Sequence, residues 1–208
     1  MNAKLRLAVP ALGAAILAAS CGTGGDNDQG IVFRAVGIYR GPASIEGGRI
    51  TCTEPTVQNA IVDTAFTLDV EEVVDFPNRS DPAADPCGGY VALENGLAAE
   101  AINLQEISIR YEIPGTAIPV PDHSVSIGQR ILPAASDQPT TSGRANLIYA
   151  ELVGQLLPRT IIVFLNRNAS ALPAPPYLLN AFLVARGQSD TGETHATNEI
   201  GYTFTITS

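Results

Sequence analysis

The sequence predicts an all-β protein, folded as an antiparallel β-sandwich with one short helix. In Ile107–Ile113 and in Tyr202–Thr207, apolar and polar residues alternate with a period of two. This alternation is typical of antiparallel strands that turn one face to a core and the other to water. The chain also contains 19 glycines and 15 prolines. Such a density of turn formers favours many short strands over long helices.

The remaining elements follow from apolar runs and from the breakers between them. The other expected strands are Ile31–Tyr39, Arg49–Thr53, Ala65–Val70, Val120–Ile127, Thr160–Leu165 and Tyr177–Arg186. We expect one helical turn within Leu93–Ala101, and a strand followed by a short amphipathic helix within Leu147–Leu157 that Pro158 ends. The proline-rich segment Asp75–Gly89 is expected to be a loop, and Gly187–Thr191 a turn.

The N-terminus has the pattern of an export signal. Lys4 and Arg6 precede an apolar run, Leu7–Ala19, that is too short to span a bilayer as a helix. Leu17-Ala18-Ala19-Ser20-Cys21 then resembles the lipobox of bacterial lipoproteins. The resemblance implies cleavage after residue 20, a diacylglycerol on the thiol of Cys21 and acylation of the new N-terminus. An ordinary secretory signal that is cut nearby and leaves Cys21 as a thiol is the alternative.

The residues after Cys21 suit a membrane tether. Residues 22–30 are small and polar and include no apolar residue that could pack in a core. Two or three acyl chains suffice for stable anchoring. By resemblance to lipoproteins of Gram-negative bacteria, Gly22 in place of aspartate implies transport to the outer membrane.

Composition bounds the partners and the chemistry. The formal charge is −9, and removal of Lys4 and Arg6 leaves 10 arginines against 21 acidic residues, or −11. A chain this acidic repels nucleic acid and anionic headgroups, so we expect no nucleic-acid partner and membrane attachment through lipid alone. Lys4 is the only lysine, which excludes mechanisms that need a lysine in the mature protein.

Two cysteines remain once Cys21 is assigned to lipid. Cys52 and Cys87 form an even pair in an exported chain, which favours a disulfide. Closing a loop of about 35 residues stabilises the fold by roughly 4 kcal/mol on the chain-entropy model. A metal or redox pair is the alternative, but the chain has neither C-x-x-C nor C-x-x-C-H.

The expected layout is a signal (residues 1–20), a tether (21–30) and a single sandwich domain (31–208). The domain divides into a loop-rich part stapled by the disulfide (31–101) and a second part (102–208). The second part, from the Ile107–Ile113 strand to the Tyr202–Thr207 strand, resembles immunoglobulin-like or fibronectin type III-like modules in its rhythm of strands and prolines. The resemblance implies a sandwich and carries no functional residue across.

No set of residues predicts catalysis, a cofactor or a strong metal site. His123 and His195 are the only histidines, and we expect both at polar surface positions. If residues 193–197 are extended, Glu193, His195 and Thr197 share a face, which is at most part of a metal site. Calcium could use Asp75, Asp81 and Asp85 in the acidic loop. No G-x-S-x-G elbow is present, which argues against a serine hydrolase.

Function is therefore expected to be binding or scaffolding in the bacterial envelope, without enzymatic activity. The first hypothesis is a surface adhesion or matrix component, and the second is a periplasm-facing accessory subunit of an outer-membrane complex. A calcium-binding or hydrolytic domain is a further alternative. The expected partner is a protein or polysaccharide. Candidate contact surfaces are Asp75–Gly89, Ala171–Pro176 and an exposed sheet edge that could accept a strand.

Overall fold

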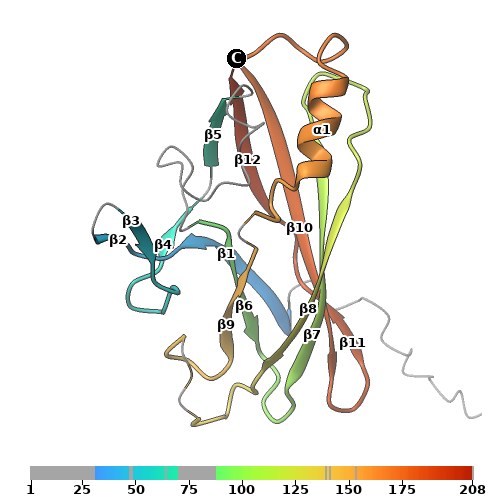
Figure 1. The fold of residues 1–208 in the computed structure, drawn as a ribbon. Coiled ribbons are helices and arrows are strands. Elements are labelled where there is room, and N and C mark those ends of the chain that lie inside the picture. Colours follow the sequence, from blue (N-terminus) through green and yellow to red (C-terminus); the bar gives the residue numbers. More distant parts are fainter. Residues whose placement is uncertain are drawn as a thin grey trace, which may run out of the picture.

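A computed structural model describes residues 31–46, 49–63, 65–69, 88–138, 140, 142–152 and 154–207. Within these residues the chain forms strands and one helix (Figure 1). The predicted all-β class with one short helix is confirmed. The elements are β1 (Phe33–Arg40), β2 (Ala43–Glu46), β3 (Arg49–Cys52), β4 (Ile61–Val62), β5 (Ala65–Asp69), β6 (Tyr90–Asn95), β7 (Ile102–Glu112), β8 (His123–Ile131), β9 (Leu147–Glu151), α1 (Arg159–Arg167), β10 (Tyr177–Ser189), β11 (Thr194–Ala196) and β12 (Ile200–Thr207).

The smaller of the two main sheets has the strand order β4-β1-β6-β9, and all its pairs are antiparallel. All six residues of β6 are buried. Val91 and Leu93 lie in the core between the sheets, and Tyr90 and Ala92 lie in a second apolar cluster with Tyr149 on the other face. The helical turn expected within Leu93–Ala101 is therefore wrong, since Leu93 to Asn95 complete β6. Burial on both faces outweighed the helix propensity of this segment. A separate hairpin joins β2 to β3.

The larger sheet has the order β5-β12-β10-β7-β8, and β11 also pairs with β10. Its pairs are antiparallel with one exception, because β12 and β5 run parallel and pair Phe204 with Phe66. The antiparallel prediction thus holds for most of the sheet and fails at this edge. β5 and β12 are far apart in the sequence, so no short hairpin fixes their relative direction.

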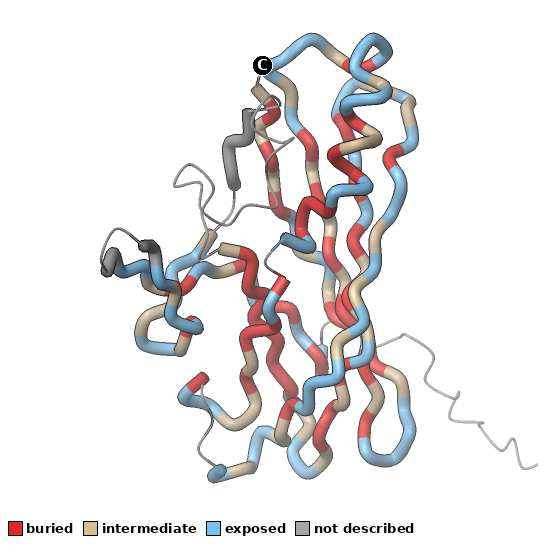
Figure 2. Tube along the Cα trace, in the orientation of Figure 1, coloured by how far each residue is buried: buried red, intermediate tan, exposed pale blue. Residues whose placement is uncertain are grey.

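One hydrophobic core lies between the two sheets and extends under α1 (Figure 2). The predicted inward faces are confirmed: Ile107, Ile109, Tyr111, Ile113, Tyr202, Phe204 and Ile206 are all buried. On the outward face of β7, Arg110 and Glu112 are exposed. Burying each large apolar side chain stabilises the fold by about 1.5–3 kcal/mol, so these alternating strands supply much of its stability.

The helix lies later in the chain than the sequence predicts. Pro158 does not end a helix but precedes α1 as its N-cap, and the strand expected at Thr160–Leu165 is wrong. Proline suits a helix start because it lacks the N–H that the first turn leaves unpaired. Ile161, Ile162 and Leu165 form the buried side of α1, a helical spacing that the β-branched composition obscured.

Tyr111 joins the larger sheet to the segment that leads into α1. Its hydroxyl donates a hydrogen bond to the carbonyl oxygen of Leu156 at 2.8 Å. Burial raises the pKa of Tyr111, so the phenol stays neutral and remains a donor. This contact fixes the position of the helix over the strands.

The long strands bend where their pairing is irregular. The register shifts between Leu104 and Glu106 on β7 and between Arg186 and Gly187 on β10, and such bulges bend a sheet. A Cβ on Gly187 would lie 2.6 Å from Cγ2 of Ile102 and 3.0 Å from the carbonyl oxygen of Asn103. The close approach of β10 to β7 therefore requires glycine here.

β10 runs between two ends of the molecule that carry different features (Figure 1). We call one the tether end, because residue 31 leads into it from the predicted tether; it comprises Val32, Asn95–Ala101, Ile131–Leu132 and Ser189–Glu193. Val32 accepts a hydrogen bond from the amide of Gly96, and the amide of Asp190 bonds to Ala101. We call the other the helix end; it comprises Ile113–Pro121, α1 and residues 168–176.

Candidate functional site

Most of the residues that the sequence singled out for covalent or metal chemistry lie outside the described residues. These are Cys21, Cys87, Asp75, Asp81 and Asp85. The lipid anchor, the Cys52–Cys87 pairing and the calcium loop therefore stay predictions. Cys52 is described as the last residue of β3, where it pairs with Ala43.

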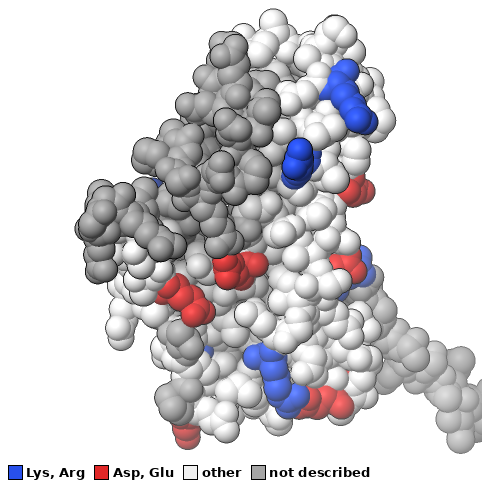
Figure 3. Space-filling view, in the orientation of Figure 1, with Lys and Arg blue, Asp and Glu red and all other residues white. Residues whose placement is uncertain are grey.

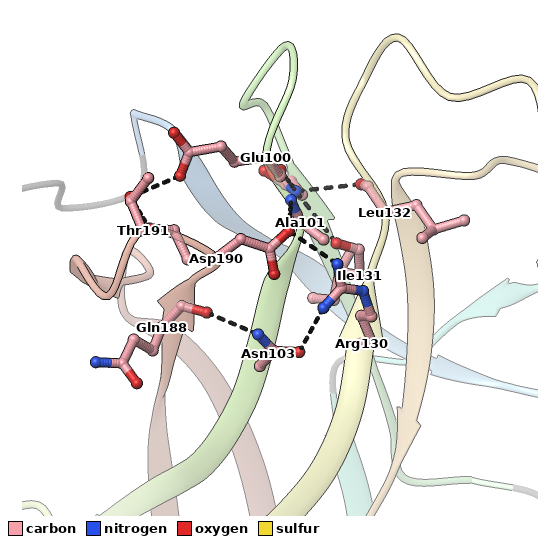
Figure 4. Close-up of polar contacts among 11 residues, drawn as sticks. Glu100, Ala101, Asn103, Arg130, Ile131, Leu132, Gln188, Asp190 and Thr191 are labelled. Carbon is pink, nitrogen blue, oxygen red and sulfur yellow. Dashed lines mark hydrogen bonds and ion pairs between the residues drawn. The ribbon is translucent and has the colours of Figure 1, made fainter.

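The tether end contains a polar cluster built around Asn95. Figure 4 labels Glu100, Ile131 and Leu132, whose carbonyl oxygens take part in it. Asn95 is fully buried. Its Nδ2 donates to the carbonyl oxygens of Glu100, Ile131 and Leu132 at 2.9, 3.2 and 3.1 Å, and its Oδ1 accepts from the amide of Leu97 at 2.8 Å. One side chain thus joins the end of β6, the start of β7 and the end of β8.

Asp190 extends the cluster to the turn after β10. It accepts hydrogen bonds from Nη2 of Arg130 at 2.8 Å and from the amide of Ala101 at 3.3 Å. The hydrogen bond from Arg130 lowers the pKa of Asp190. Arg130 also donates to Oδ1 of Asn103, whose Nδ2 donates to the carbonyl oxygen of Gln188 (Figure 4).

The cluster acts as a structural clamp. Each donor and acceptor just described is bonded within the chain, and Thr191 donates to the carboxylate of Glu100 at 2.7 Å. No serine or cysteine nucleophile in it is paired with a base, so the cluster offers no acyl-transfer arrangement. Sequence analysis missed Asn95 and Asp190, because their partners are distant in the chain and no local motif marks them.

The outer face of the smaller sheet carries a second charged group. Glu94 accepts hydrogen bonds from Arg34 on β1 and from Arg144 before β9. Burial alone would raise the pKa of Glu94, but the hydrogen bonds and charges of the two arginines lower it below its ordinary value. Beside this group, the rings of Tyr39 and Tyr149 meet edge to face at 5.6 Å. The carboxylate thus holds three segments together.

The histidines do not form a joint site. His123, the first residue of β8, is half-buried, and its Nε2 lies 3.1 Å from Oε1 of Gln155. His195 lies on β11 opposite Gly187 and is buried, so the expectation of a surface position is wrong for it. β11 pairs with the long strand β10 and also contacts β1, so this position lies against the domain and not on its surface. Glu193 is exposed while Thr197 is buried, and no potential metal-binding group of three such side chains occurs among the described residues.

Two of the predicted contact surfaces lie in described regions. In the segment Ala171–Pro176 at the helix end, Leu172 is buried and Pro175 and Pro176 are exposed. β8 ends the larger sheet and pairs only with β7 within the described residues. Ser124 and Ser126 are exposed on it, but the irregular pairing opposite Gln105 breaks its regular edge. The helix end is therefore the better candidate for contact.

No protein-family model, curated protein or solved structure matches the chain. In the described part of the chain, no helix combines the length and hydropathy needed to cross a bilayer.

Proposed function

We propose that this chain is a lipid-anchored binding or scaffolding module of the bacterial outer membrane, without catalytic activity. The observation that carries the proposal is the order of three features: the lipobox-like Leu17–Cys21, a small and polar stretch at residues 22–30, and β1 starting at Phe33. A tether from Cys21 to Ile31 reaches at most about 35 Å when extended. It joins the domain at the tether end and leaves the helix end free.

A disulfide between Cys52 and Cys87 belongs to the same proposal. Its support is that Cys52 ends β3 in an exported domain, and that Cys87 is the cysteine left over when Cys21 carries lipid. A disulfide persists in an exported domain, because the compartments outside the cytosol do not reduce it. Mass mapping without reductant should find Cys52 and Cys87 in one linked peptide, and a link from Cys52 to Cys21 would contradict the pairing.

We also propose that the sandwich is immunoglobulin-like and serves as a rigid support for contact loops at one end. Its support is a shared core between two largely antiparallel sheets. Rigid sandwiches commonly carry binding residues on the loops at their ends. Here the free end carries α1 and residues 168–176, which makes a protein or polysaccharide partner at that end the first hypothesis.

The experiment is protease shaving of intact cells, with Cys21→Ala as the control that removes the anchor. Clipping of the wild type on whole cells would favour the surface adhesion or matrix role. Protection until the outer membrane is opened would favour the second role, an accessory subunit that faces the periplasm. Release of the wild type from membranes as readily as Cys21→Ala would overturn the anchored module itself.

A further inference from the structure

Two arginines on α1 have no partner within the described residues. Arg159 and Arg167 are both exposed, and neither takes part there in an ion pair or a side-chain hydrogen bond. By contrast, four other arginines each pair with a carboxylate: Arg34, Arg110, Arg130 and Arg144. The two charges on α1 are therefore available to another molecule.

The position of Arg159 works against the stability of the helix. It is the first residue of α1, the first turn has no acidic residue, and Pro158 supplies no side-chain cap. The N-terminus of a helix carries partial positive charge, so an acidic residue would be favourable here and arginine is not. A residue that breaks a local rule without a compensating contact points to a role outside the fold.

Arg159, Val163 and Arg167 follow one another at four-residue spacing and so lie along one side of α1. We call these three residues the α1 stripe. Along the axis the two arginines are about 12 Å apart, and Val163, half-buried, lies between them. The stripe thus presents two guanidinium groups with an apolar side chain at its centre.

Within the described residues, the segments that make up the helix end contain no acidic residue, although the chain as a whole is acidic and Asp122 follows Pro121 directly. No aspartate or glutamate occurs between Glu151 and Asp190, or within Ile113–Pro121, in a chain of formal charge −9. On the described part of the face where α1 lies, the two uppermost basic groups lie among mostly uncharged atoms, with one acidic group below them and the other acidic groups further toward the middle and the tether end (Figure 3). An acidic partner meets less repulsion at this surface than elsewhere on that face.

We propose that the α1 stripe docks an acidic segment of a partner protein. Carboxylates of that segment pair with Arg159 and Arg167, since the guanidinium fork matches a carboxylate in two parallel hydrogen bonds. An apolar side chain between the carboxylates covers Val163, a contact for which a protein segment supplies larger aliphatic groups than a sugar ring does. The inference rests on the proposed binding role and names its surface and partner. The stripe lies at the helix end, so an anchored domain points it away from lipid headgroups.

The test measures binding of a fluorescein-labelled peptide in which a leucine pair is flanked by glutamates, by fluorescence anisotropy. The protein is the full chain purified from membranes in a non-ionic detergent. We expect saturable binding that weakens with added salt and falls by about tenfold in the double variant Arg159→Gln/Arg167→Gln. Arg159→Lys/Arg167→Lys should retain part of the affinity, because the charge remains and the fork is lost.

The matched control is Arg110→Gln, which removes an exposed arginine from the larger sheet and should leave the affinity unchanged. Equal losses in Arg110→Gln and in the double variant would overturn the stripe as the site. So would peptide binding that is insensitive to the double variant. Arginine-dependent binding of polygalacturonate or of phosphatidylglycerol vesicles in place of the peptide would overturn the protein partner. Cys21→Ala should still bind the peptide, so a failed anchor is distinguishable from a failed stripe.

Discussion

Nδ2 of Asn95 lies 3.2 Å from the carbonyl oxygen of Ile131, a contact that joins the smaller sheet to the larger one. The same nitrogen donates to Glu100 and Leu132. Three main-chain acceptors at the tether end thus depend on one buried amide.

Asn95→Ala should lower the free energy of unfolding by about 3 kcal/mol, because it leaves buried carbonyl groups without their donor. Asn103→Ala is the control in the same cluster, since Asn103 is half-buried, donates one bond of 3.4 Å to Gln188 and accepts one of 3.2 Å from the exposed Arg130. Urea unfolding of both variants measures the difference. Equal losses would show that Asn95 is no more important than its neighbours.

The Glu94 carboxylate should make stability depend on pH. Its pKa in the folded protein is lower than the ordinary value of 4.5, so its contribution is present above that value and is lost as the pH falls through the folded pKa. Glu94→Gln should flatten the dependence of unfolding free energy on pH below 4.5. The same variant should lower the free energy of unfolding at neutral pH by about 2 kcal/mol.

Glu112→Gln is the control for this effect, because Glu112 and its partner Arg110 are both exposed and 3.5 Å apart. An exposed pair contributes little. Chemical unfolding from neutral pH down to mildly acidic pH compares the two variants. An unchanged pH profile in Glu94→Gln would remove the arginine-bound carboxylate from the account of acid stability.

Gly187→Ala should destabilise the bend of the larger sheet by about 2 kcal/mol, since the added methyl group would overlap Ile102. Gly128→Ala on β8, two strands away in the same sheet, meets nothing within 4 Å and should raise stability by about 0.5 kcal/mol, as alanine is favoured over glycine in a strand. Thermal unfolding of the two variants should show a lower midpoint temperature for Gly187→Ala and a higher one for Gly128→Ala. A neutral Gly187→Ala would mean that the close approach of β10 to β7 is not needed.

Arg159→Glu should raise the free energy of unfolding by about 0.5 kcal/mol, because it places a negative charge at the N-terminus of α1. Arg167→Glu, in the last turn of the same helix, should lower it by about the same amount. Both variants should also bind the glutamate-flanked peptide more weakly than the wild type. Stability changes of the same sign would reflect net charge rather than the helix dipole.

Alternation predicts strands well because its period is local. The residues of Ile107–Ile113 and Tyr202–Thr207 carry their inward face in their own sequence, and the fold follows it. The strand predicted at Thr160–Leu165 is wrong, because a short run rich in β-branched residues does not distinguish a buried strand from the buried side of a helix. The antiparallel prediction fails for β5 and β12, because these strands are far apart in the sequence and no local pattern specifies their relative direction.

The sites follow the same division. The prolines of Ala171–Pro176 predict an irregular segment, which the structure shows, while its contact role stays a prediction. The clamp at Asn95 and the pairing of Glu94 with Arg34 and Arg144 were not recognisable from the sequence, because their partners lie up to 91 residues apart in the chain. The free charges on α1 were not either, since only the structure separates unpaired arginines from paired ones.

The most direct test of the anchored module is the intact mass and N-terminal peptide of the protein purified from membranes. We expect the mature chain to begin at Cys21, with a diacylglycerol on its thiol and an acyl chain on its amine. Cys21→Ala should carry neither and should leave the membrane fraction. A mature chain that begins at another residue, or an unmodified Cys21 on a membrane-bound protein, would contradict lipid anchoring and the orientation that follows from it.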